Sequence, residues 1–237
     1  MKMNTRPPTI HIDSRVAVYT DRRLPDFGQA EIKNEPMLFN CDLDHATRYG
    51  GWITQEFLDL LPAAWQNVPL VIDSRVHMLM PGWYPCIPGW HHDDVPRTRP
   101  DGQPNYDEGQ DRSDHIIALV NGDIAPTHFA LGEASFAIPD GPEPFYAVWH
   151  RKVEELCQQQ WPFPSLERFV APSNHLIKFN DRTWHTGTAA VANGWRFFIR
   201  ASRYWDANGE PIARRNPRTN EVRRQVQVYL ADPFKGW

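Results

Sequence analysis

Short β-prone runs separated by turn signals fill residues 71–204, and they constrain the fold more than any other feature of the sequence. The turn signals, such as PG, NGD and ANG, combine glycine, proline, asparagine and aspartate, which favour chain reversal. The runs expected to form strands are 71–80, 116–120, 127–138, 175–180, 183–191 and 195–204. Six or more short strands, with helices mostly outside the run, predict a barrel or a sandwich with helical buttresses.

The proline and aromatic content also favours a fold that is mostly β. The 237 residues include 22 prolines and 10 tryptophans but only 14 glycines. Proline interrupts helices, and aromatic side chains suit pleated, half-buried surfaces. Apolar residues recur at helical spacing in two places, which predicts helices at about 54–61 and 145–160.

We expect a single domain, because no repeat, linker or low-complexity segment divides residues 1–237. Within it, residues 1–70 are predicted to form an N-terminal extension with a buttressing helix, residues 71–204 the β core, and residues 205–237 a C-terminal extension. The polar segment 95–113, which follows a cluster of histidines and aspartates, is long enough to be a lid over a binding site.

Hydropathy, charge and cysteine spacing argue against several classes of protein. No stretch approaches the roughly 20 apolar residues of a transmembrane helix, and the first residues lack the apolar core of a signal peptide. We therefore expect a cytoplasmic protein. The net charge of −4 argues against a dedicated nucleic-acid binder. The three cysteines lie far apart and indicate neither a disulfide framework nor a cysteine-rich zinc site.

The sequence GWHHDD contains the densest cluster of metal-binding side chains. A His-x-Asp spacing occurs twice in it, as His91 with Asp93 and as His92 with Asp94. Residues i and i+2 of an extended chain project to the same side, so either pair can present an imidazole and a carboxylate to one ion. Taken alone, such a pair is more typical of a solvated polar loop. His185 lies in a later strand run, where a lone histidine is more often a hydrogen-bonded core residue.

Two arginines share one face of the strand run that follows His185. In the sequence WRFFIRASRY, Arg196 and Arg200 alternate with apolar residues of the opposite face. Taken alone, this pattern is typical of a half-exposed strand with its arginines in solvent.

Together, a His-x-Asp pair, a histidine on a later strand and an arginine on the next strand resemble the motif of the Fe(II)/2-oxoglutarate-dependent oxygenase superfamily. The match covers about residues 71–204. The resemblance implies a mostly β fold, the double-stranded β-helix or jelly roll, with flanking α-helices. It implies Fe(II), 2-oxoglutarate as cosubstrate and O₂, with decarboxylation of 2-oxoglutarate to succinate. A small or medium-sized molecule would be hydroxylated, although desaturation and demethylation stay open.

The resemblance also implies the metal ligands. They would be His91, Asp93 and His185, because an apolar residue immediately precedes the first ligand in similar members of the superfamily. The pair His92 and Asp94 remains the alternative. Two imidazoles and one carboxylate on one face of an ion are the facial arrangement that suits non-haem Fe(II) oxygenases.

Arg200 lies fifteen residues after His185, at the position from which one branch of the superfamily binds the distal carboxylate of 2-oxoglutarate. Arg196 would help it from the same strand face. A guanidinium suits this role because it stays charged and holds a carboxylate in bidentate fashion. Further candidate contacts to the cosubstrate or the substrate are Thr127, Tyr84 and Arg97.

Two other functions stay open on the sequence. A cupin-like metalloenzyme would use the same ligands without a 2-oxo acid cosubstrate, and it would give Arg196 and Arg200 no particular role. A non-catalytic jelly-roll binding module would hold no iron. The partner expected for an enzyme is a small-molecule substrate, with no membrane and no nucleic acid, and the oligomeric state has no signature in the sequence.

Overall fold

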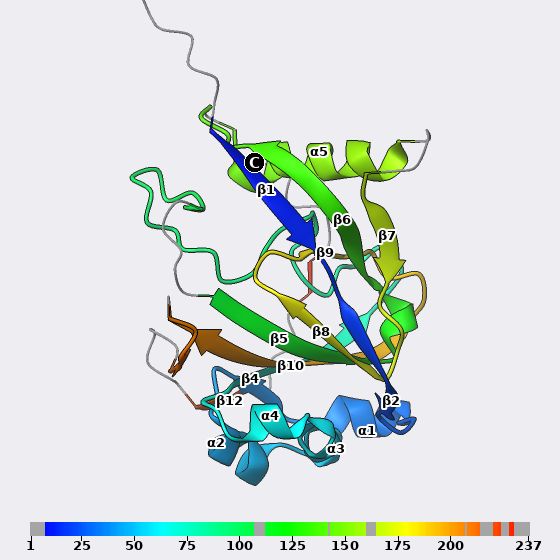
Figure 1. Ribbon diagram of the computed structural model, residues 1–237. Coiled ribbons are helices and arrows are strands. Elements are labelled where there is room, and N and C mark those ends of the chain that lie inside the picture. Colours follow the sequence, from blue (N-terminus) through cyan, green and yellow to red (C-terminus); the bar gives the residue numbers. More distant parts are fainter. Residues whose placement is uncertain are drawn as a thin grey trace, which may run out of the picture.

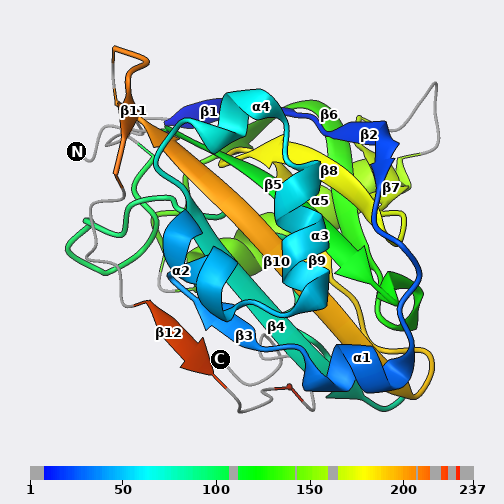
Figure 2. The same ribbon diagram turned by 90° about the horizontal axis from the view of Figure 1, so that it is seen from below.

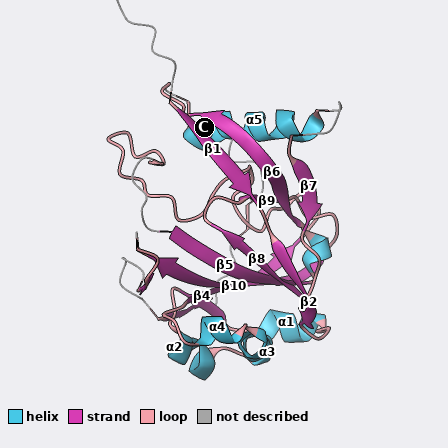
Figure 3. Cartoon of the chain, in the orientation of Figure 1, coloured by secondary structure: helices cyan, strands magenta, loops and turns pink. Residues whose placement is uncertain are grey.

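The computed structural model describes residues 8–106, 112–141, 143–159, 165–206, 208–213, 220–223 and 228–229. These residues form two curled antiparallel sheets with helices on their outer sides (Figure 1; Figure 3). The prediction of a mostly β fold is confirmed. Every helix among the described residues is too short or too polar to span a membrane.

The smaller sheet is built around one long strand. Strand β6 (Thr127–Ala137) pairs antiparallel with β1 (Thr9–Ser14), β7 (Glu167–Val170) and β9 (Trp184–Gly187). The pairing with β9 sets Phe129 opposite His185. The strand that carries His185 is therefore held in a defined register against β6.

The larger sheet has the strand order β11-β10-β5-β8-β2, and β4 pairs with β10 on the edge opposite β5. Its members are β2 (Ala17–Arg23), β4 (Val71–Leu79), β5 (Arg112–Val120), β8 (His175–Asn180), β10 (Gly194–Trp205) and β11 (Pro211–Ile212). The register between β10 and β4 sets Arg196 opposite His77 and Arg200 opposite Asp73. A separate pair joins β3 (Met37–Phe39) to β12 (Glu221–Arg223).

Four short helices cover the outer face of the larger sheet (Figure 2). They are α1 (Gln29–Asn34), α2 (Leu43–Tyr49), α3 (Trp52–Leu60) and α4 (Ala63–Gln66), and a 3-10 turn, η1, follows β5 at Gly122–Ile124. Apolar side chains of α3, such as Phe57, pack against Ile72 of β4 and Phe197 of β10 in one buried cluster. The predicted helix at 54–61 is α3, whereas the other three helices have too few turns to show a helical spacing in the sequence.

Helix α5 (Phe145–Gln158) packs on the smaller sheet, as the sequence predicts for 145–160. Its fully buried Trp149 joins Trp90 and Trp184 in a second apolar cluster. Part of the high tryptophan content thus fills the space between a helix and a sheet.

The N-terminal strands correct one expectation about residues 1–70. β1 pairs with β6 along six residues and β2 pairs with β8, so both belong to the sheets themselves, where the sequence indicated an extension packed on the domain. Of the predicted C-terminal extension, 205–237, only 205–206, 208–213, 220–223 and 228–229 lie within the described residues. The division into a single domain stays a prediction.

Candidate metal centre and its cavity

Three metal-binding side chains from distant parts of the chain meet at one point. His91 and Asp93 follow β4, His185 lies on β9, and one potential ligand atom of each lies within 4.8 Å of the others. Backbone pairing holds the two segments together: the N–H of His91 donates to the carbonyl of His185 at 3.1 Å, and the reverse bond measures 3.3 Å. The fold itself therefore sets the distance between the two imidazoles.

Backbone carbonyls assign the same tautomer to both imidazoles. The Nδ1 of His91 lies 2.7 Å from the carbonyl of Gly89, and the Nδ1 of His185 lies 3.0 Å from that of Thr183. A carbonyl only accepts hydrogen bonds, so each Nδ1 carries the proton and each Nε2 keeps its lone pair for a metal ion. Burial and the neighbouring His185 lower the pKa of His91 to about 4, which keeps its ring neutral at pH 7.

The carboxylate of Asp93 is held by Arg200. Its Oδ2 accepts a hydrogen bond from Nη1 of Arg200 at 2.5 Å and lies 3.5 Å from Nε2 of His185. Burial alone would raise the pKa of Asp93, but the positive charge of Arg200 outweighs it and holds that pKa well below its usual range. Asp93 is therefore ionised at neutral pH, as a metal ligand must be. The donor set fits a divalent ion.

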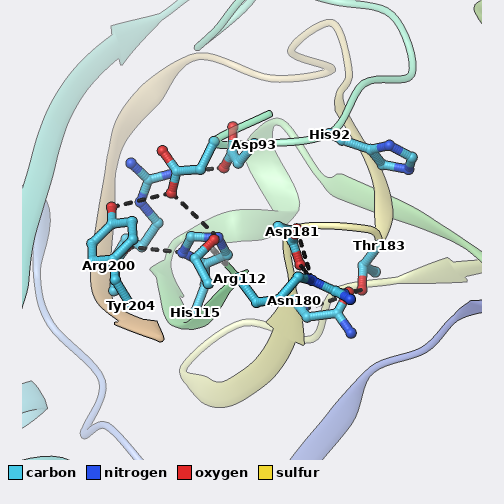
Figure 4. A network of polar contacts seen from close by, with 12 residues as sticks. His92, Asp93, Arg112, His115, Asn180, Asp181, Thr183, Arg200 and Tyr204 are labelled. Carbon is cyan, nitrogen blue, oxygen red and sulfur yellow. Dashed lines mark hydrogen bonds and ion pairs between the residues drawn. The ribbon is translucent and has the colours of Figure 1, made fainter. Parts of the chain in front are cut away.

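The side chain of His92 makes different contacts from that of His91. Its ring packs on Trp184 with the centroids 3.8 Å apart, and its Nδ1 hydrogen-bonds with the hydroxyl of Tyr106 at 2.7 Å. Figure 4 shows His92 turned away from Asp93. Among the described residues, His92 joins no group of side chains that could hold a metal ion.

Asp94 belongs to a polar network with Tyr204 and His115, which Figure 4 shows. The hydroxyl of Tyr204 donates to its Oδ2 at 3.1 Å, and Nε2 of His115 lies 3.7 Å from the same atom. His115 also hydrogen-bonds with Ser202 at 2.8 Å and with Ser113 at 3.1 Å. The structure thus brings His91 and Asp93, and not the alternative pair, together with His185.

A cavity of about 430 Å³ opens on these three side chains from between the two sheets. Side chains alternate along a strand, so every second residue of β4 and β10 faces it. Its polar lining outside the three candidate ligands includes Asp73, Arg75, His77, Thr127, Arg196 and Arg200. The predicted common face of Arg196 and Arg200 is confirmed, and that face lines the cavity instead of lying in solvent.

Arg196 is a buried cation with few partners. Its side chain is 2% exposed, its Nη2 donates to Thr127 Oγ1 at 3.1 Å, and its Nε has no hydrogen-bond partner. Within the described part of the chain, no carboxylate lies within 4.0 Å of this guanidinium. Burial lowers the pKa of Arg196 to about 10, so it stays charged at pH 7. An anion that reached this guanidinium would meet a charge that the protein leaves unbalanced.

Arg200 differs from Arg196 because two carboxylates of the protein already hold it. Its Nη1 donates to Asp93 at 2.5 Å and its Nη2 to Asp73 at 3.3 Å. Burial lowers the pKa of Arg200, but these carboxylates outweigh that effect and raise it above its ordinary value. Arg200 therefore orients Asp93 in the structure.

The three further candidate contacts are placed differently from one another. Thr127 lines the cavity and accepts the hydrogen bond from Arg196. Tyr84 pairs through its backbone with Tyr229 and does not line the cavity, although Tyr229 does. The guanidinium of Arg97 lies 5.9 Å from the ring centroid of Tyr146, outside the cavity lining.

The predicted lid at 95–113 is described in part. Residues 107–111 lie outside the described residues, and 112–113 belong to β5. Tyr106, 8% exposed, hydrogen-bonds with His92 and with Tyr146, and so ties one end of the segment to the core. Movement of the segment stays a prediction.

No family model matches the sequence, and no curated protein matches it. Three solved structures of HygX from Streptomyces hygroscopicus are similar to the chain. The apo structure has a TM-score of 0.37 and 12% identity, over 84% of this chain and 82% of that one. The structure with iron bound has a TM-score of 0.31 and 12% identity, over 84% of this chain and 82% of that one. The structure with nickel and 2-oxoglutarate bound has a TM-score of 0.32 and 11% identity, over 84% of this chain and 83% of that one. The likeness is distant, so this chain's own side chains carry the functional inference.

Proposed function

We propose that the chain is an Fe(II)/2-oxoglutarate-dependent oxygenase that hydroxylates a small or medium-sized molecule and converts 2-oxoglutarate to succinate. One observation carries the proposal: a single cavity contains both a group of two histidines and one aspartate and a buried arginine without a counterion. Two curled sheets that face each other across this cavity are consistent with the jelly-roll fold of that superfamily.

In this proposal His91, Asp93 and His185 hold Fe(II). Bound by these three residues, the ion would supply the site at which the 2-oxo acid and O₂ react. Contacts within the chain already set the ligand atoms in the form that binds a metal ion. Carbonyls fix the two imidazoles with Nε2 unprotonated, and Arg200 holds the carboxylate of Asp93 in its ionised form.

Arg196 and Thr127 are proposed to receive the distal carboxylate of 2-oxoglutarate. The sequence pointed to Arg200 for this role, with Arg196 as its helper. The Nε of each arginine lacks a hydrogen-bond partner, but Arg200 would have to release Asp73 or Asp93 to bind the cosubstrate, whereas Arg196 has no carboxylate partner among the described residues. A charge-assisted pair at Arg196 also removes the cost of an uncompensated buried cation.

The two alternatives leave part of this arrangement without a purpose. A cupin-like enzyme with no 2-oxo acid gives the buried Arg196 no anion to bind. A binding module gives the preset tautomers of His91 and His185 no metal. Neither alternative has a specific observation in its favour.

The test is an anaerobic titration of the Fe(II)-loaded protein with 2-oxoglutarate, followed by the visible charge-transfer band of a chelated 2-oxo acid. We expect the band in the parent protein, and a dissociation constant at least 30-fold higher in Arg196→Gln with its iron content unchanged. The matched control is Arg48→Gln, which removes an exposed arginine on α2 and should leave the titration unaltered. An iron-loaded parent without the band would reject the proposal and favour the cupin-like enzyme. If Arg200→Gln weakened binding while Arg196→Gln did not, the anchor would be Arg200.

A further inference from the structure

We infer that the substrate sharing this cavity with 2-oxoglutarate carries a carboxylate or phosphate group, and that Arg75 binds it. This inference rests on the proposed function and names the class of its substrate. Strand β4 places Asp73, Arg75 and His77 in the cavity lining, and none of them was assigned a function from the sequence.

Arg75 lines the cavity from β4, between Asp73 and His77, which line it as well. Its neighbour across the strand pair is Phe198 of β10, which lines the cavity between Arg196 and Arg200 on the same strand face. The side chain is only partly buried. It therefore lies where a bound molecule and solvent can both reach it.

The contacts of Arg75 leave its charge unbalanced. Nη1 donates to the carbonyls of Leu38 at 3.3 Å and Ser74 at 2.8 Å, which are neutral acceptors. Among the described residues, no carboxylate lies within ion-pair distance of its guanidinium. Asp73, two residues away on the same strand face, already accepts hydrogen bonds from Arg200 and from the backbone of Asn40. Burial lowers the pKa of Arg75, and the attraction of Asp73 does not offset that effect.

The sum of the charges of the described lining residues also indicates Arg75. Three guanidiniums stand against the two carboxylates of Asp73 and Asp93. His77 adds no charge, because burial and Arg196 lower its pKa to about 3. A divalent ion and the doubly charged cosubstrate cancel each other, so one positive charge remains. Arg200 is paired and Arg196 is proposed to hold the cosubstrate, which leaves that charge on Arg75.

The surroundings of Arg75 indicate the rest of the ligand. The ring of Phe39 lies 5.2 Å from its guanidinium, and Phe198, Ile87 and Tyr229 line the same cavity. A volume of about 430 Å³ falls within the range of roughly 300–1,000 Å³ that small-molecule sites occupy. The site thus suits a small molecule with an apolar or aromatic body and one anionic group.

The arginine that the sequence suggested for a substrate contact is elsewhere. Arg97 lies over Tyr146, and its neighbour Arg99 pairs with Asp101 at 3.0 Å; neither lines the cavity. Arg75 is the described guanidinium of the lining that has neither a carboxylate partner nor a proposed cosubstrate role.

The test is anaerobic calorimetric titration of the protein loaded with Fe(II) and saturating 2-oxoglutarate. The probes are two matched pairs, 3-phenylpropionate with 3-phenylpropanamide and phenyl phosphate with phenol. We expect at least one acid to bind tenfold or more tightly than its neutral partner, and the acid that binds more tightly distinguishes a carboxylate from a phosphate. Arg75→Gln should abolish that preference, and Arg75→Lys should restore part of it. Arg48→Gln, with the same loss of charge outside the cavity, should keep it.

Several results would overturn the inference while the cosubstrate band persists. These are equal binding of both members of each pair, no measurable binding of either acid at 10 mM, or a preference that survives in Arg75→Gln. If Arg75→Gln removed the 2-oxoglutarate band and Arg196→Gln did not, Arg75 would belong to the cosubstrate site. Absence of the band in the iron-loaded parent would instead reject the proposed function itself.

Discussion

Replacing Arg196 by methionine should stabilise the protein in the absence of metal and cosubstrate. Methionine keeps a long unbranched side chain but removes the buried charge. Burial lowers the pKa of Arg196 from its ordinary value to about 10, and at 1.36 kcal/mol for each pKa unit this corresponds to a cost of about 3 kcal/mol. The lost hydrogen bond to Thr127 offsets about 1.5 kcal/mol of the gain, so Arg196→Met should gain about 1–2 kcal/mol.

The size of the stabilisation expected for Arg196→Met depends on pH. Because the folded pKa lies below the unfolded one, the unfolded chain binds more protons than the folded protein only above about pH 10, up to the ordinary pKa of arginine. The full cost of the charge is therefore present at pH 7. Urea denaturation of the metal-free parent and Arg196→Met at pH 7 measures the difference.

Bound cosubstrate should reverse the order of stability of the parent and Arg196→Met. With Fe(II) present and 2-oxoglutarate at 100 times its dissociation constant, the parent gains about 2.7 kcal/mol, whereas Arg196→Met gains little. The parent then becomes the more stable protein. Destabilisation of metal-free Arg196→Met by more than about 1 kcal/mol would refute the reasoning, because it would mean that the folded protein already compensates this charge.

Four further outcomes follow from the same contacts. Arg200→Met should destabilise the metal-free protein by about 3–5 kcal/mol in urea denaturation, because it removes the cation that pairs with the carboxylates of Asp73 and Asp93; a neutral effect would contradict the pairing. His185→Ala should lose stoichiometric iron with its far-UV circular dichroism unchanged, and full iron content would remove His185 from the site. Burial lowers the pKa of His77 to about 3, so below pH 6.5 the unfolded chain binds a proton at this residue that the folded protein does not bind. The free energy of unfolding should therefore fall by about 1.4 kcal/mol per pH unit below pH 6.5, and His77→Asn should flatten this slope. Limited proteolysis within 95–113 should slow when substrate binds, and an unchanged rate would leave the segment a passive surface loop.

The metal-binding residues show what local spacing predicts and what it leaves open. Both His-x-Asp pairs satisfy the i, i+2 rule, so spacing alone does not choose between them. The choice in the structure comes from contacts between distant segments. His91 pairs through its backbone with His185, and His92 packs on Trp184, almost a hundred residues later in the chain. Such contacts have no local signature.

The arginines show the same limit. Strand alternation correctly predicted that Arg196 and Arg200 share a face, but it gave no information on which guanidinium is paired. The pairing of Arg200 depends on Asp73, which the antiparallel register of β4 with β10 brings opposite to it from 127 positions away. The alternation of polar and apolar residues along 71–79 was the available signal that β4 also has two different faces.

The larger sheet explains how charged side chains persist inside this fold. On its outer face, Ile72, Phe197 and Ile199 pack against the helices and bury apolar surface. That packing fixes the strands, so the residues between them must face the other sheet whatever their polarity. There Arg200 and Asp73 neutralise each other, whereas the charges of Arg196 and Arg75 stay without a carboxylate partner among the described residues. An unpaired buried cation destabilises a fold unless an anion binds it, which applies to Arg196, and the partly buried Arg75 also lacks a carboxylate among the described residues. The two positions are therefore consistent with two anionic ligand groups in one cavity.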